Sequence, residues 1–406
     1  MPIREVPLSA EFFQDPWPLY EELRSDGPLH QVKLPNGQQM WLVIGHELAR
    51  QLLSHPGLSK DRAKGWQLAQ SHGTSGAGAD ASMRIAKNML NSDPPDHTRL
   101  RALVGKAFTS HASAYLRPRM EQIAHQLLAD IQPGSTIDLL EDYAFPLPIR
   151  VITELLGIPY TDRDRFRSWS QTIIDHPPFS DAEEVRAARN EFADYLANLI
   201  AAKRAGPRGK DLLDQLIDAR VVDDRLSDTE LISTVALLII AGHETTVHLI
   251  ANTVFLIALD SKLRARALHD RTALRAILEE TLRFEGPAHT TTLRHTVTEI
   301  ALNEATIPKE EFVLVSLAAA NRDPEKFVNP NKFDPTRNVG GHLGFGHGIH
   351  YCVGAGLARL EAEVAIERLL AKFPNVTIAA DPSSLRWRSG LLRGRTALPV
   401  VLDIDD

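Results

Sequence analysis

The chain's only cysteine, Cys352, lies in the segment 345–361, which reads FGHGIHYCVGAGLARLE. Gly346, Gly348 and Gly354 allow tight turns and close approach to a bulky flat group, because glycine carries no side chain. We expect an amphipathic helix to begin at the cysteine. Unpaired N–H groups and the positive dipole at a helix start favour a cysteine that has lost its proton. Such a thiolate is suited to hold a metal, including the iron of a haem.

Three other interpretations of this segment stay open on the residues alone. A zinc site could use His342, His347, His350 and Cys352, although structural zinc loops more often supply ligands as two separated pairs. A hydrolase could use Cys352 as nucleophile with His350 as base, although such partners usually meet through the fold. A lone cysteine can also simply be a buried residue.

A second segment whose residues could take part in chemistry is 231–259. It reads LISTVALLIIAGHETTVHLIANTVFLIAL, and Glu244 is its single carboxylate. Its length would suffice to span a membrane, which takes about 20 apolar residues. A carboxylate at mid-bilayer costs roughly 2.5 to 3.5 kcal/mol, so we expect a helix buried in a protein core instead. The Thr245 hydroxyl can bond a carbonyl one turn earlier, where Gly242 already weakens the helix and could open a groove. Ordinary threonine hydroxyls in helices do the same without any function.

Glu280 and Arg283 form a third pattern, within a helix expected at 272–284 before Pro287. Residues three apart share one face of a helix. An exposed pair of this kind is common and contributes little to stability. Taken alone, the pair therefore indicates no particular function.

Composition fits an enzyme-sized protein of a reducing compartment, although a single cysteine would also fit a secreted protein without disulfides. The chain has 406 residues, of which 43% are hydrophobic, enough for a large core. A single cysteine forms no internal disulfide. Lys and Arg total 45 against 52 Asp and Glu, and the net charge of −7 predicts no broad attraction to nucleic acid. The segment 1–24 resembles neither a signal peptide nor a membrane anchor, so we expect a cytoplasmic protein.

Apolar residues recur mostly at helical spacing, above all over 94–283. The sequence predicts one domain over 1–406, mainly α with small β-sheets. A hairpin is expected around Pro35-Asn36-Gly37, because Asn-Gly favours the tight turn. The segment 71–82 is of low complexity and has too little apolar surface to fold alone. Further helices are expected at 16–24 and 46–53, and strands at 29–34, 39–44, 290–297, 312–316 and 400–404.

The three patterns together resemble the cytochrome P450 monooxygenases. F-G-x-G-x-H-x-C-x-G, from Phe345 to Gly354, resembles the family's haem-binding loop. The stretch AGHETT, beginning at Ala241, resembles its oxygen-binding helix motif. Glu280 and Arg283 match its E-x-x-R motif, which lies between the other two in the expected order. The resemblance covers almost the whole chain and implies a single triangular domain of the P450 fold.

The resemblance also implies roles for individual residues. Cys352 would be the axial ligand of haem b, with Ala241, Phe345, Gly346 and Gly354 beside the haem. Glu244 and Thr245 would be the acid and alcohol that deliver protons during oxygen activation. Other matched positions are the propionate partners His97, Arg101, Arg294 and His350, and Arg337, a structural partner of Glu280 and Arg283.

The implied reaction is hydroxylation or epoxidation of an apolar small molecule with O2. Electrons would come from NAD(P)H through a ferredoxin reductase and a ferredoxin, and a monomer is expected. Similarity of AGHETTVHLI to actinobacterial enzymes of polyketide and macrolide tailoring favours a bulky natural product, while steroids, terpenoids and peptides stay open. A haem-binding protein without turnover is the alternative of a different class. The segment 71–82 would cover the substrate entrance, and the expected pocket residues are Met89, Leu90, Leu238, Ala288, Thr291 and Leu391.

Overall fold

The computed structural model describes residues 4–5, 10–34, 37–73, 82–105, 110–176, 182–207, 209–221, 224–303 and 305–404. Most of the low-complexity segment 71–82 lies outside these ranges, as do Pro35 and Asn36 of the predicted hairpin turn.

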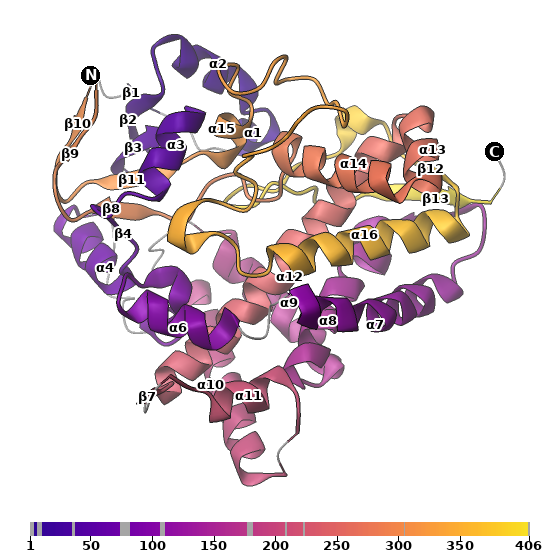
Figure 1. Ribbon diagram of the computed structural model, residues 1–406, viewed down its shortest axis with the longest axis horizontal. Coiled ribbons are helices and arrows are strands. Elements are labelled where there is room, and N and C mark those ends of the chain that lie inside the picture. The colour runs from indigo at the N-terminus through magenta and orange to yellow at the C-terminus, as the bar shows by residue number, and fades with distance from the viewer. Residues whose placement is uncertain are drawn as a thin grey trace.

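Helices form most of the molecule, which has a roughly triangular outline that tapers towards α10 and α11 (Figure 1). The prediction of a mainly helical fold with small sheets is confirmed. A π-helical turn at Leu140–Ala144 precedes α8. The α-helices are α1 (Ala10–Gln14), α2 (Trp17–Ser25), α3 (His46–Leu53), α4 (Arg62–Ser71), α6 (Asp96–Gly105), α7 (Ser110–Ala129), α8 (Pro146–Leu156), α9 (Arg163–Ile174), α10 (Glu183–Ala205), α11 (Leu212–Asp218), α12 (Asp228–Ala258), α13 (Ser261–His269), α14 (Arg271–Phe284), α15 (Leu317–Asn321) and α16 (Ala355–Lys372).

A six-stranded sheet with the order β1-β2-β3-β11-β8-β4 lies towards the N-terminal side of the molecule (Figure 1). A three-stranded sheet has the order β12-β13-β5, and two short hairpins pair β9 with β10 and β6 with β7. The strands are β1 (Arg4–Glu5), β2 (Leu29–Lys33), β3 (Gln39–Val43), β4 (Leu58–Ser59), β5 (Ser135–Asp138), β6 (Arg220–Val221), β7 (Asp224–Arg225), β8 (Arg294–Thr296), β9 (Ile300–Ala301), β10 (Thr306–Ile307), β11 (Phe312–Val315), β12 (Asn375–Ile378) and β13 (Pro399–Asp403).

One predicted strand is much shorter in the structure. Instead of a strand over 290–297, only β8 forms a ladder. The preceding residues change partners, because Ala288 bridges to Leu392 while Thr290 bridges to Ser316. This change prevents a continuous ladder and leaves the segment before β8 to line cavities described below.

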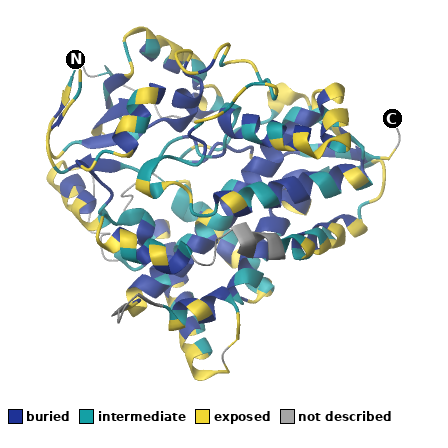
Figure 2. Ribbon diagram, in the orientation of Figure 1, coloured by how far each residue is buried: buried dark blue, intermediate teal, exposed yellow. Residues whose placement is uncertain are grey.

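The long apolar helix α12 crosses the middle of the molecule as the core helix predicted from its sequence (Figures 1 and 2). It begins with a capping box between Ser227 and Glu230. Among the described helices, it alone is long and apolar enough to cross a membrane, yet 72% of its most apolar window is buried in the protein. Helix α12 therefore has the burial of a core element.

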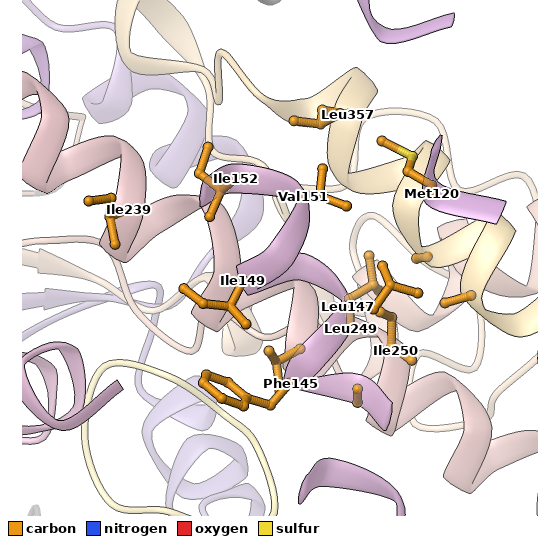
Figure 3. Close-up of a cluster of buried hydrophobic side chains, with 14 of the residues drawn as sticks. Met120, Phe145, Leu147, Ile149, Val151, Ile152, Ile239, Leu249, Ile250 and Leu357 are labelled. Atoms are coloured by element: carbon orange, nitrogen blue, oxygen red, sulfur yellow. The ribbon is translucent and has the colours of Figure 1, made fainter. Parts of the chain in front are cut away.

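Helix α8 packs closely on α12. Figure 3 shows Phe145, Leu147 and Ile149 from the start of α8 beside Leu249 and Ile250 of α12. At the other end of this contact, a Cβ atom on Gly242 would lie 3.1 Å from Cγ1 of Ile152. Gly242 thus permits the two backbones to approach, which is a packing reason for this glycine.

Glu280, Arg283 and Arg337 meet in a buried cluster. The side chains of Glu280 and Arg283 are both fully buried and share two hydrogen bonds of 2.7 Å. Arg283 also donates to the carbonyls of Asn321 and Pro330 at 3.0 and 2.9 Å. Arg337 approaches Glu280 at 3.4 Å. The cluster fixes the chain that leads from α15 to the cysteine loop.

Candidate active site

Cys352 faces a cavity of about 350 Å³ between α12 and the cysteine loop, which we call the thiol cavity. Residues from widely separated segments line it, and most predicted site residues are among them. They are Ala241, Glu244 and Thr245 of α12, Arg101 of α6, Arg294 of β8, and Phe345, Gly346, His350, Cys352 and Gly354 of the loop. The fold therefore brings the cysteine loop and α12 together in one cavity with the predicted propionate partners Arg101 and Arg294, whereas the predicted partner His97 is not among the lining residues.

Two glycines shape the cysteine loop. Gly346 and Gly348 both have φ of +73°, a conformation that residues with side chains rarely adopt. A Cβ atom on Gly348 would also lie 2.8 Å from the carbonyl oxygen of Leu53. The Cys352 amide donates to the Phe345 carbonyl at 3.0 Å, which closes the loop.

The predicted helix start at Cys352 is wrong by three residues, because α16 begins at Ala355. The thiol is accessible from the cavity but lies deep in the protein, and burial raises its pKa above the usual value. The Gly354 amide and the charges of Arg101 and Arg359 oppose this rise. The protein alone therefore does not make Cys352 a thiolate, but a metal ion on the sulfur would displace the proton.

The structure does not support zinc at the cysteine loop. In the described ranges, which include His342, His347, His350 and Cys352, no three His, Cys, Asp or Glu side chains are grouped to hold a metal ion. His342 instead lies 3.0 Å from Glu279. No hydrogen bond joins His350 to Cys352 in the described part of the chain, so the hydrolase pair finds no support either.

Side chains that carry nitrogen donors gather at the thiol cavity and beside it. His97 and His350 pack ring to ring with centroids 4.4 Å apart, and Arg101 donates to the Tyr351 carbonyl at 2.7 Å. Within the described residues, Nε of buried Arg294 and both ring nitrogens of His97 lack a hydrogen bond of good geometry. Burial, then the charge of Lys60, lowers the pKa of His350 to about 2. Sequence analysis missed Lys60, which also lines this cavity.

These groups fit the carboxylates of a haem. Buried nitrogen donors without partners are costly unless an acceptor reaches them. A haem in the thiol cavity could supply acceptors through its two propionates, while Cys352 supplies the sulfur. The donor set is therefore compatible with the group that the sequence resemblance implies.

Thr245 and Glu244 lie on the α12 side of the thiol cavity. The Thr245 hydroxyl donates to the Ala241 carbonyl at 3.0 Å, as expected for a helical threonine. Helix α12 nevertheless continues without a break, so the expected loosening does not interrupt it. Burial would raise the pKa of Glu244, but His243, Arg388 and His248 together lower it to about 2.

Glu244 also borders a second, polar cavity of about 410 Å³. Arg388 lines it and donates to Oε2 of Glu244 at 3.3 Å and to both oxygens of Asp175 at 2.7 Å. Its other lining residues include Arg167, His248 and the exposed Thr396. We call this space the polar cavity. Sequence analysis missed Arg388 and Asp175, which lie in segments without a recognisable motif.

All six predicted pocket residues line the thiol cavity. Leu90, Thr291 and Leu391 also line an adjoining cavity of about 510 Å³, whose other walls come from the N-terminal helices, β3 and α4. The adjoining cavity and the thiol cavity together form a large, mainly apolar space on the Thr245 side of α12. That space was not predictable from motifs, because its walls come from many segments.

Comparison with known proteins shows the family of the chain. The family model for cytochrome P450 matches residues 134–393. Cytochrome P450 107B1 of Saccharopolyspora erythraea is 45% identical over 396 residues, covering 96% of this chain and 95% of the relative. Cytochrome P450 monooxygenase PikC of Streptomyces venezuelae is 42% identical, covering 97% and 92%. The structure of tirandamycin C-bound P450 monooxygenase TamI superposes with a TM-score of 0.89 and 42% identity, covering 98% and 100%. The chain thus belongs to the cytochrome P450 family of monooxygenases.

Proposed function

We propose that Cys352 ligates the iron of haem b in the thiol cavity, with His97, Arg101, Arg294 and His350 around the propionates. The observation that carries this proposal is the convergence on one cavity of an accessible cysteine sulfur and the buried side chain of Arg294, whose Nε has no hydrogen-bond partner within the described residues. A thiolate-bound haem supplies activation of dioxygen, with transfer of one oxygen atom to an apolar molecule. Phe345, Gly346, Gly354 and Ala241 would form the walls beside the haem.

We further propose that Glu244 and Thr245 hold and move the protons that oxygen activation consumes. Glu244 borders both the polar cavity and the thiol cavity, so a proton that enters through the former can reach its carboxylate. The Thr245 hydroxyl, bonded to the Ala241 carbonyl, can accept from one neighbour and donate to another by rotating. This pair would thereby connect solvent to the reacting side of the cavity.

The proposed substrate is a bulky apolar natural product, of macrolide or polyketide type, that is hydroxylated or epoxidised. Support comes from the joined apolar cavities and from relatives named for such molecules. One is the mycinamicin IV hydroxylase/epoxidase of Micromonospora griseorubida, which is 36% identical and covers 94% of both chains. A steroid-like substrate is the second candidate, because vitamin D(3) 25-hydroxylase of Pseudonocardia autotrophica is 40% identical.

For the remaining properties we propose a cytoplasmic monomer with one domain over residues 1–406. Its electrons would come from NAD(P)H through a ferredoxin reductase and a ferredoxin. The mostly buried state of α12 supports a helix that belongs to the core rather than to a membrane.

The absorption spectrum of the reduced, carbon monoxide-bound protein tests the proposed ligand. We expect a strongly red-shifted Soret band, which is characteristic of a thiolate on the iron. The matched Cys352→Ser variant should lose this shift, since an alcohol is a poor substitute for a thiolate. A protein that takes up no haem on supplemented expression would overturn the proposal, as would an unshifted band in the unmodified chain.

A further inference from the structure

Lys60 lies at the junction of the thiol cavity and the adjoining cavity, and it lines both. It directly follows β4, the edge strand of the six-stranded sheet beside β8 (Figure 1). The antiparallel register pairs Leu58 with Thr296 and Ser59 with His295. Lys60 lies one residue beyond this ladder, and extending the register by that residue would set it opposite Arg294. The charge of Arg294 acts on the Lys60 ammonium, which agrees with this placement.

Two cations side by side in a buried place are unfavourable by themselves. Lys60 is 5% exposed and Arg294 is 4% exposed. Like charges directly opposite on neighbouring strands repel, and a buried charge needs a partner. Burial, together with the charge of Arg294, lowers the pKa of the Lys60 ammonium well below its usual range. The arrangement is therefore costly unless an anion reaches both side chains.

The nearby carboxylate of Asp93 satisfies this need only in part. Its Oδ1 accepts from the backbone amide of Lys60 at 2.9 Å, and its Oδ2 accepts from the Ser59 hydroxyl at 2.5 Å. In the part of the chain that the structure describes, no carboxylate comes within ion-pair distance of the Lys60 ammonium. Nε of Arg294 also lacks a hydrogen-bond partner there.

We propose that Lys60 and Arg294 together bind one carboxylate group at this junction. Two sources could supply that carboxylate: a propionate of the haem, or the acidic end of a substrate. Local charge favours the propionate. Lys60, Arg294 and Arg101 against Asp93 leave two positive charges, which equal the charge of two propionates. Lys60 would then be a cofactor-binding residue outside the set that the sequence predicted. This inference rests on the haem site proposed above.

The first arm of the test measures haem retention in purified holoprotein. Lys60→Met removes the charge at similar length, Lys60→Arg keeps a cation, and Lys64→Met is the matched control. Lys64 is a nearby lysine on α4 whose side chain is 64% exposed beside Asp61. If the carboxylate is a propionate, Lys60→Met should release haem to excess apomyoglobin about tenfold faster, since it loses a charge-assisted hydrogen bond. Its ferric/ferrous midpoint potential should also become more negative, because a cation favours the reduced iron. Lys60→Arg should stay close to the unmodified protein in both measurements.

The second arm measures the binding of myristic acid and of its methyl ester by the shift of the Soret band. If the carboxylate belongs to the substrate, Lys60→Met should bind the acid about tenfold more weakly and the ester as before. Haem release would then equal that of the control. Either pattern supports a carboxylate site at Lys60 and identifies its source.

The inference is overturned if Lys60→Met behaves like Lys64→Met in haem release, midpoint potential and myristic acid binding. In that case the haem is still bound, so the proposed function stands while the role of Lys60 does not. A protein that binds no haem would instead overturn the proposed cofactor site and the propionate source with it. Circular dichroism of each variant establishes that differences do not arise from unfolding.

Discussion

Two buried glutamate–arginine clusters of this protein, at Glu280 and at Glu244, differ in how completely their polar groups are bonded. Arg283 shares two hydrogen bonds of 2.7 Å with Glu280 and donates further to backbone carbonyls. Arg388 reaches Glu244 through one contact of 3.3 Å, and Oε1 of Glu244 lies 3.4 Å from Nε2 of His243 without a hydrogen bond of good geometry within the described residues. The first cluster is enclosed in protein, while the second borders two cavities. A saturated polar network fixes a fold, whereas an incompletely bonded one can exchange protons and partners.

The largest effect that would test this comparison is on stability. Glu280→Gln keeps the shape of the side chain but leaves Arg283 buried without its counter-charge. We expect a loss of about 3 to 5 kcal/mol in the free energy of unfolding, the usual cost of breaking a buried pair. Urea denaturation measures this loss. Glu47→Gln is the control, because Glu47 is 83% exposed and its pair with Arg50 should contribute at most about 1 kcal/mol. Equal losses in both variants would contradict a special structural role for Glu280.

Replacing glutamate by glutamine in the Glu244 cluster should affect turnover more than stability. Glu244→Gln leaves Arg388 paired with Asp175, so we expect a smaller loss of unfolding free energy than for Glu280→Gln. Oxygen-dependent turnover should fall on the order of 100-fold, since the amide of Gln cannot accept and pass on a proton as a positioned carboxylate can. Oxygen uptake with a surrogate ferredoxin and reductase measures the rate. If Glu244→Gln destabilised the fold as strongly as Glu280→Gln, the two clusters would not differ in kind.

Thr245→Ala separates proton delivery from substrate binding. The hydroxyl that donates to the Ala241 carbonyl is lost, but no charge changes. We expect oxygen uptake to continue while several-fold more of the electrons end in hydrogen peroxide, because protons arrive without control of their position. The peroxide formed per NAD(P)H consumed measures this. Thr245→Ser keeps a hydroxyl and should restore coupling; equal peroxide yields in all three proteins would remove Thr245 from proton delivery.

The sequence could predict only part of the difference between the two clusters. Glu280, Arg283, Glu244 and Thr245 lie in short motifs on two helices, where local spacing fixes which side chains are neighbours. Arg388 lies 144 residues after Glu244 and follows no periodic pattern, so nothing local predicts their contact. The sequence also could not predict that carbonyls of distant loop residues accept the remaining hydrogen bonds of Arg283.

Short strands were also difficult to predict from the sequence. Strand β4 has two residues, too few for a periodic signal, and the importance of Lys60 depends on its pairing with β8. The predicted strand at 290–297 failed because Ala288 and Thr290 bridge to different partners, which only the tertiary fold determines. Core helices such as α12 were predicted well, since their apolar length is a property of the segment itself.

The smallest expected effect concerns the acid stability of the Glu244 cluster. Burial opposes ionisation of Glu244, but His243, Arg388 and His248 lower its pKa to about 2. A carboxyl with a lowered pKa stabilises the fold above its ordinary value of about 4.3, and this contribution is lost as the pH falls towards 2. Arg388→Gln should raise the pKa of Glu244 in the folded state, so its contribution to stability becomes smaller and acid should unfold the variant at a higher pH.

Acid unfolding followed by circular dichroism measures this shift of the pH midpoint. Arg388→Gln also removes the partner of Asp175, whose pKa is already raised by burial. Asp175→Asn is therefore measured in parallel, so that the effect of Asp175 on the pH midpoint can be separated from the effect of Glu244. Arg386→Gln, on the same segment but exposed, is the matched control. If Arg388→Gln and Arg386→Gln unfold at the same pH, Arg388 does not hold Glu244 in its ionised form. The polar cavity would then carry protons to Glu244 without an arginine that controls its charge.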